Sequence, residues 1–230
     1  SIQTSFSIIP YTLSIFIANT VVAKFYDRYP PRHIARAGFI VVASALTLIA
    51  FTVSNQWGQL PIVLGLIMLG LGQGAIVALV FNTLLSASPK ELAGDVGAWR
   101  GLVHNISGSV GISIATVFAV SLLSMLILSN ATASPVITPE IIDQLNFDNV
   151  NFLTNDQVED ILANRIGANP EEVAKAVLIN AEARLRALKI SLLGLASLAL
   201  LAIVPAGRMP GFREEDLPVG YPDQVADKSA

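Results

Sequence analysis

The feature that most constrains this chain is a run of 53 residues, 37–89, that contains no Asp, Glu, Lys or Arg. Three other stretches lack these residues as well: 1–23, 101–139 and 190–207. Only 13% of the whole chain is charged, against about 25% in an ordinary soluble domain. A charge-free run of this length is enough for two membrane crossings of about 20 residues each. The sequence therefore predicts an all-α integral membrane protein.

The composition also excludes several classes of protein. A hydrophobic fraction of 53% excludes a disordered chain, and the long apolar runs exclude a soluble globular enzyme. The net charge of −3 offers no basic surface for nucleic acid. Without cysteine there is no disulfide framework and no thiolate metal site. The two histidines, His33 and His104, lie too far apart in the sequence to indicate a metal site by themselves.

Five apolar runs have the length of a membrane span. Because a spanning segment must satisfy its own backbone hydrogen bonds in lipid, each run is predicted to be a helix. The fourth run exceeds the thickness of the hydrocarbon layer, so we expect its first turns, around Trp99 and Arg100, to lie outside that layer. The predicted spans are 6–25, 34–53, 60–85, 98–128 and 188–206.

Basic residues in the short connections predict the orientation of the spans. Four of them lie between the first two spans: Lys24, Arg28, Arg32 and Arg36. The connection 54–59 has no Lys or Arg. We therefore expect the first connection and the tail 207–230 to be cytoplasmic. Residues 54–59 and 129–187 then face the outside.

The outer segment 129–187 carries the signals of several helices. Thr138 followed by Pro139 and Glu140 is one predicted helix start. Residues 154–157 match a capping box, and Gly167 is suited to end that helix. Another start is predicted at 169–172, with no break before Pro205. We expect this segment to form a helical cap or hairpin on the membrane part, since it is too short for a large domain.

The loop after the first span contains an acid in an unusual position. Asp27 follows the C-terminal end of the predicted helix, where the helix dipole favours cations. A specific partner for Asp27 is one interpretation, and an ordinary solvated loop with a positive-inside charge pattern is the other.

This loop resembles the G-x-x-x-D-R-x-G-R-R signature of major facilitator superfamily transporters. Asp27, Arg28 and Arg32 match the signature. It departs from the signature at three positions: Ala23 stands at the first glycine, and Pro30 and Pro31 replace the second glycine and one basic residue.

Small residues in the third and fourth spans extend the resemblance. The third span contains Gly65, Gly70, Gly72 and Gly74. In the fourth span Gly97, Gly101, Asn105 and Ser109 recur every four residues. Small residues at such spacings let helices approach closely in lipid. The stretch 81–111 is similar to the corresponding spans of the fourteen-span drug–proton antiporters, which also have a long outer loop before their last span. The resemblance implies that residues 1–128 and 188–206 are five helices of a facilitator-type bundle in the C-terminal half of a transporter.

The resemblance also implies a conformational latch at the inner face. Asp27, supported by Arg28 and Arg32, would pair with a basic residue of the opposite half. Arg100 would receive the equivalent acid of that half. An interfacial arginine whose charge reaches toward water is the alternative for Arg100.

Polar side chains within the spans are the candidates for the substrate path, because such groups face a cavity or another helix. Helix–helix hydrogen bonding is the alternative role. For His104 a proton relay competes with simple packing, since histidine exchanges a proton near neutral pH. The predicted spans contain no deep Asp or Glu, so we expect the coupling carboxylate in the other half. The candidates are Tyr11, Asn19, Gln73, Asn82, His104 and Asn105.

The function implied by the resemblance is secondary active transport, not enzymatic catalysis. We expect proton-coupled efflux of hydrophobic or cationic drug-like compounds by alternating access, driven by the proton gradient, with no bound cofactor or metal. The expected partners are membrane lipid, the N-terminal half of the same transporter and a small-molecule substrate, with no nucleic acid. The expected location is the cell membrane, as a multi-pass protein. A metabolite or lipid transporter and a non-transporting membrane scaffold are the alternatives.

The chain begins at Ser1 without a basic segment before its first apolar run. We therefore expect no signal peptide there, and a chain that is a portion of a longer protein.

The predicted orientation can be tested by accessibility labelling. Reagents that do not cross the membrane should reach Lys24 and Trp57 from opposite faces, because one span separates them. Labelling of both positions from the same face would contradict the assignment of the spans.

Overall fold

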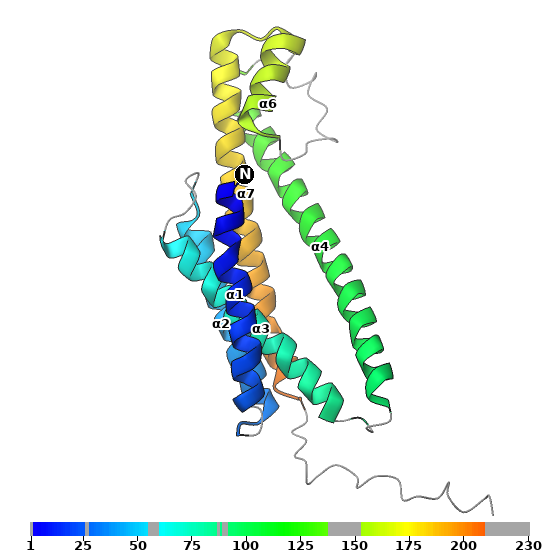
Figure 1. The fold of residues 1–230 in the computed structure, drawn as a ribbon. Helices are drawn as coiled ribbons and strands as arrows, with labels where there is room; N and C mark the ends of the chain where they lie inside the picture. Colours follow the sequence, from blue (N-terminus) through cyan, green and yellow to red (C-terminus); the bar gives the residue numbers. More distant parts are fainter. Residues whose placement is uncertain are drawn as a thin grey trace, which may run out of the picture. The chain divides into compact units, whose positions relative to one another are not determined.

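The computed structural model describes residues 2–25, 28–54, 60–86, 88, 92–137 and 153–209. All regular structure within these residues is helical (Figure 1). The chain divides into two compact units. Unit 1 comprises Ser1–Leu48, Gly58–Gly108 and Leu195–Ala230, and unit 2 comprises Ile49–Trp57 and Ser109–Gly194.

The helices follow the apolar runs of the sequence. The predicted helical character of all five runs is confirmed, although the fourth helix is longer at both ends than the predicted 98–128. The elements are α1 (Ile2–Phe25), α2 (Pro31–Thr52), α3 (Leu60–Ser86), α4 (Ala93–Thr132), α6 (Asn155–Asp160), the π-helical turn η3 (Ile161–Ile166), α7 (Pro170–Leu201) and α8 (Ile203–Ala206).

Four helical segments are long and apolar enough to cross a membrane, which agrees with the predicted all-α membrane class. They are Pro31–Thr52, Leu60–Ser86, Gly94–Thr132 and Pro170–Ala206. Helix α1 contributes a shorter apolar stretch, Ile8–Val22. Several predictions concern residues outside the described ranges: the helix start at 138–140 and the connection 55–59 with Trp57.

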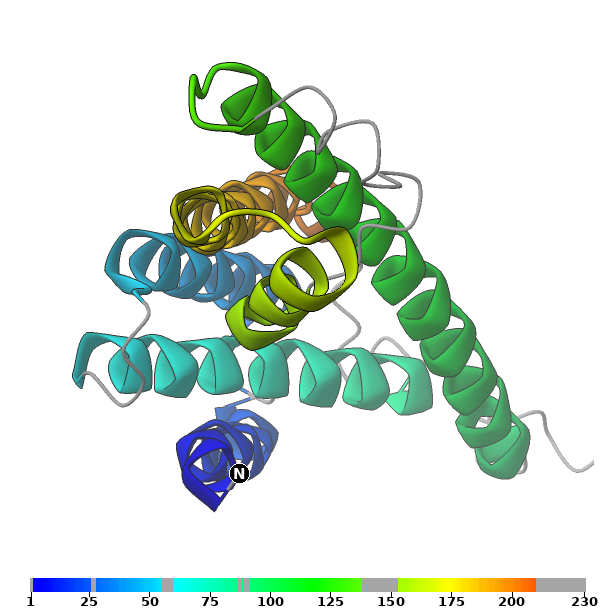
Figure 2. The same cartoon turned by 90° about the horizontal axis from the view of Figure 1, so that it is seen from above.

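In unit 1, helix α3 lies between α1 and α2 (Figure 2). Gly70 and Gly74 are four residues apart, so they share the face of α3 that meets α1. A Cβ atom on Gly74 would lie only 2.6 Å from the carbonyl oxygen of Ile15. Gly72 is rotated by about 200° from Gly70 and faces α2. A Cβ atom there would lie 2.9 Å from the carbonyl oxygen of Gly38. Glycine therefore allows α3 to touch the backbones of both neighbours.

Hydroxyl groups within these apolar helices bond to their own backbone. The Ser14 hydroxyl donates to the carbonyl oxygen of Pro10 at 2.6 Å, and the Thr47 hydroxyl donates to that of Ala43 at 2.8 Å. Bonds from a residue to the carbonyl four positions earlier satisfy a hydroxyl without a partner helix. This is how polar Ser and Thr side chains are accommodated in segments that have apolar surroundings.

One end of unit 1 is held by a cluster of buried apolar side chains from four helices. Val22 of α1, Ala35 of α2, Leu79 of α3 and Ala206 of α8 form its centre. Met209, just after α8, packs against them. The cluster fixes the end of the last helix beside the end of α1 and the start of α2.

In unit 2 the helix ends are set by local hydrogen bonds, as the sequence predicts. Thr154 and Gln157 form a reciprocal capping box at the start of α6. Gly167, at φ 74°, ends η3 in the left-handed conformation that glycine adopts without strain. The side-chain oxygen of Asn169 accepts the backbone N–H of Glu172 at 2.9 Å, and the Glu172 carboxylate accepts that of Asn169 at 2.9 Å.

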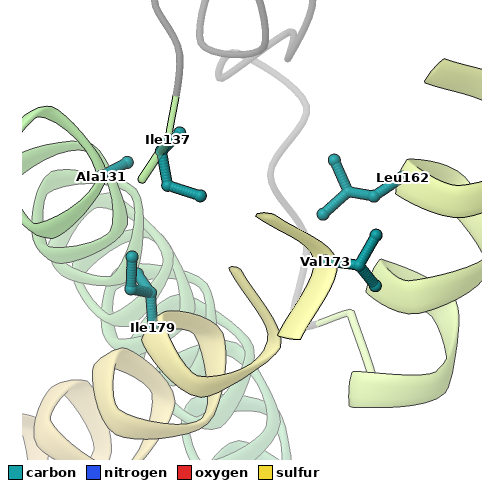
Figure 3. Close-up of a cluster of buried hydrophobic side chains, with 5 residues drawn as sticks. All are labelled: Ala131, Ile137, Leu162, Val173 and Ile179. Carbon is teal, nitrogen blue, oxygen red and sulfur yellow. The ribbon is translucent and has the colours of Figure 1, made fainter. Parts of the chain in front are cut away.

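Unit 2 has two apolar clusters. Leu123 of α4 packs with Ala183 and Ala187 of α7. The second cluster gathers side chains from α4, η3, α7 and the segment after α4 (Figure 3); they are Ala131, Ile137, Leu162, Val173 and Ile179. Part of the predicted outer segment therefore forms a helical hairpin with a core of its own.

The small-residue ladder of α4 does not behave as the sequence predicts within the described residues. A Cβ atom on either glycine of the ladder, Gly97 or Gly101, would meet no atom within 4 Å, and the same holds for Gly108 beside it. For these glycines, the expected close helix contact is not made inside the described chain. Of the glycines expected to pack closely in the third span, Gly70, Gly72 and Gly74 of α3 all lie against neighbouring helices.

The two kinds of glycine predict opposite effects of alanine. Gly70→Ala should lower the free energy of unfolding by about 1–3 kcal/mol, because its methyl group would overlap the Ser14 side chain, 2.9 Å from the Cβ position. Gly101→Ala is the matched control and should be neutral or stabilising by up to about 1 kcal/mol, since alanine favours helix. Thermal unfolding of the purified protein in detergent measures both. Equal melting temperatures for the two variants would contradict the packing role of Gly70.

Candidate functional site

The candidate site is a polar pair between two apolar helices. The Tyr11 hydroxyl of α1 donates a hydrogen bond to the side-chain oxygen of Gln73 on α3. Gly70 lies about one turn before Gln73, and its Cα faces the backbone carbonyl of Tyr11. The glycine contact therefore brings α3 close enough for Gln73 to reach the phenol.

The chemistry of this pair follows from its surroundings. A hydroxyl or amide without a hydrogen bond is costly in an apolar medium. The Tyr11–Gln73 bond satisfies the phenolic proton and one amide oxygen. The Gln73 side chain is exposed and Tyr11 is half-buried. The amide N–H₂ of Gln73 is not used in this bond. The pair therefore offers the amide N–H donors of Gln73 next to the aromatic ring of Tyr11. It carries no formal charge.

The other predicted path residues do not join this pair. Asn82 is nine residues beyond Gln73, which rotates it by about 180° to the opposite face of α3. Asn19 is half-buried on α1, about 80° round from Tyr11. His104 and Asn105 are exposed on α4. Of the six candidates, the described structure joins Tyr11 and Gln73 by a direct hydrogen bond.

The predicted latch residues lie at the ends of helices. Arg28 is exposed in the turn after α1, where its backbone N–H donates to the carbonyl oxygen of Phe25 at 3.0 Å. Arg32 is exposed in the first turn of α2. Asp27, the acid on which the predicted latch depends, lies outside the described residues.

Arg100 has a partner that sequence reasoning missed. Its guanidinium carbon lies 4.6 Å from the centre of the Phe81 ring, a cation–π contact between α4 and α3. The two residues flank the connection between these helices, which is the one signal that could have paired them. Arg100 is half-buried. Part of its side chain therefore packs against the protein and does not only extend into water.

Metal ligation has no support in the described part of the chain. Within it, no group of three or more His, Asp or Glu side chains lies close enough together to hold a metal ion. The candidate site is therefore described by its hydrogen bonds and aromatic contacts.

A double-mutant cycle can measure the Tyr11–Gln73 bond. Tyr11→Phe and Gln73→Leu should show a coupling energy of about 0.6 kcal/mol, and at most about 1.7, as for other hydrogen bonds between membrane helices. Unfolding in detergent measures it. Tyr11→Phe with Asn82→Leu is the matched control and should be additive within about 0.5 kcal/mol, because Asn82 lies on the opposite face. Additivity in both cycles would argue against the bond.

Comparison of the chain with protein-family models, with curated proteins and with solved structures finds no match. Its description therefore rests on its own residues. The described residues form helices only, and four helical segments are long and apolar enough to cross a membrane.

Proposed function

We propose that this chain is the C-terminal portion of a secondary active membrane transporter of the major facilitator type. It exports hydrophobic or cationic drug-like compounds in exchange for protons, by alternating access. Its partners are membrane lipid, the other half of the same transporter and the transported compound.

The observation that carries the proposal is the Tyr11–Gln73 bond between α1 and α3. Polar side chains are expensive within membrane-spanning segments, and where they occur they commonly mark a substrate path. Transporter sites lie between helices near the middle of the bilayer. Tyr11 and Gln73 both lie well inside their helices, and Tyr11 is distant from Lys24 at the end of α1, which agrees with such a position.

The chemistry of the pair supports a hydrophobic or cationic substrate. Between Ile8 and Val22, and along the whole of α3, there is no Asp, Glu, Lys or Arg. A site without basic groups does not favour anions. An aromatic face attracts a cation by about 0.5–2 kcal/mol, and the apolar walls accept the rest of such a compound.

The packing of α1, α2 and α3 supports movement as one body. The glycine contacts of α3 bring its backbone against those of α1 and α2, and such close packing favours movement of the three helices together. Alternating access consists largely of rigid bodies rocking around a site. Arg100 against Phe81 joins α4 to the end of α3 in the arrangement described here. In the proposed cycle, exchange of Phe81 for an acid of the opposite half provides the latch.

Proton coupling is assigned to residues beyond the three packed helices. Since α3 and Ile8–Val22 contain no carboxylate, the coupling acid of the proposed transporter lies in its other half. His104 is exposed on α4 and is the one imidazole within the predicted spans. It remains the proposed proton carrier of this chain.

Transport can be tested with the complete gene product in proteoliposomes that contain a pH-sensitive dye. Addition of ethidium, a hydrophobic cation, should cause proton flux with the wild-type protein. The double variant Tyr11→Phe/Gln73→Leu should lower the rate about tenfold or more at equal insertion, because both polar groups of the site are removed.

Thr12→Val is the matched control for this measurement. It removes a hydroxyl next to Tyr11 that bonds to the carbonyl of Ile8 in its own helix, at 3.3 Å. The flux should stay at the wild-type level. Correctly inserted wild-type protein that moves neither protons nor any hydrophobic cation would instead favour the membrane scaffold.

A further inference from the structure

Five exposed basic side chains lie at one end of unit 1, and we name them the cationic rim: Lys24, Arg28, Arg32, Arg36 and Arg208. Lys24 is in the last turn of α1, and Arg28 is in the turn that follows. Arg32 and Arg36 occupy the first two turns of α2. Arg208 follows α8, and its backbone N–H donates to the carbonyl oxygen of Pro205 at 3.0 Å.

The buried cluster of unit 1 brings these positions together. Val22, Ala35 and Ala206 pack in one group. Each lies within two residues of a basic side chain: Lys24, Arg36 and Arg208 respectively. Figure 1 shows the end of α1, the start of α2 and the orange end of the last helix at the same end of unit 1.

Arg36 connects the rim directly to the last helix. Its guanidinium group lies against Gly207, with Cζ and Nε each 2.8 Å from the position that a Cβ atom would take. A side chain at position 207 would displace the guanidinium. The positive charge of Arg36 on α2 therefore lies directly beside the end of α8.

The positive charge on α2 is poorly compensated by its own helix. The first turn of α2 contains no acidic residue. The helix dipole is positive at this end and disfavours a cation there. Arg32 and Arg36 are four residues apart, so they lie on one face and repel each other. An anion between them would relieve both unfavourable interactions.

Apolar side chains beside the rim indicate what kind of anion fits. Ile40 is four residues beyond Arg36, so it continues the same face of α2, and it is 50% exposed. Val21 and Phe25 of α1, on either side of Lys24, are each 43% exposed. An acidic peptide or a free phosphate would match the charges but leave this apolar surface uncovered. A molecule with an anionic head and acyl chains matches both.

We propose that the cationic rim binds an anionic phospholipid, with its phosphate between Arg32 and Arg36 and an acyl chain along the face that Ile40 begins. Basic side chains on the cytoplasmic side of membrane helices attract such headgroups. The bound lipid would connect the start of α2 with the end of the last helix through Arg36 and Arg208. This inference requires only that the helices lie in a membrane, so it is independent of transport activity.

The test uses the purified protein in detergent micelles doped with dioleoyl phosphatidylglycerol or dioleoyl phosphatidylcholine. Native mass spectrometry counts the retained lipid. The wild-type protein should retain more phosphatidylglycerol than phosphatidylcholine. Arg32→Gln/Arg36→Gln should weaken that retention by about fivefold for each arginine removed.

Two further variants keep the test decisive. Arg32→Lys/Arg36→Lys retains both charges and should keep the preference for phosphatidylglycerol. Arg184→Gln/Arg186→Gln removes two charges from α7 in unit 2 and should leave retention unchanged. If the two lipids are retained equally by the wild-type protein, or if the α7 variant loses as much lipid as the α2 variant, the proposal is wrong.

Inorganic phosphate separates a lipid site from a general anion site. Phosphatidylglycerol should raise the melting temperature of the wild-type protein, and phosphate at the same concentration should not, because it lacks the chains that contact Ile40. Equal stabilisation by phosphate would overturn the assignment to a lipid.

Discussion

Close contact between helix backbones is the constraint on which unit 1 depends. In lipid, helices gain little from burying apolar side chains against each other, because the lipid tails are equally apolar. Association then relies on dispersion contacts at short range, and these need small residues. Gly70 and Gly74 give α3 this contact with α1, and Gly72 with Gly38 gives it with α2. The Tyr11–Gln73 bond and the shared end cluster follow from that arrangement.

The helices could be predicted from the sequence because their signals are local. Charge-free runs set the positions of the long helices, and individual residues set several ends. Thr154 with Gln157, Gly167 and Pro170 all act where the sequence places them. Such signals depend on neighbours a few residues away, so no knowledge of the packing is needed to interpret them. Helix α4 (Ala93–Thr132) is longer than the predicted span 98–128, because the helix continues for several residues beyond each end of the apolar run.

The candidate site could be predicted only in part, because it depends on which helix faces meet. Tyr11 and Gln73 were both among the polar candidates, but nothing in the sequence indicates that they would bond to each other while Asn82 faces away. The glycines of α3 and α4 include pairs of the same four-residue spacing, yet the close contacts described here use those of α3. The contacts of Arg100 with Phe81 and of Arg36 with Gly207 are likewise set by packing. Composition does not reveal them.

The turn between η3 and α7 has a consequence for the order of folding. Gly167 ends one helix and Asn169 begins the next, so both termini are complete within a few residues of chain. Asn180 then bonds to the carbonyl of Leu153 and the side chain of Asn155, fewer than thirty residues away. Contacts of short sequence separation form fastest. The hairpin of unit 2 is thus suited to form as soon as its own residues are synthesised, because it needs no contact with distant parts of the chain.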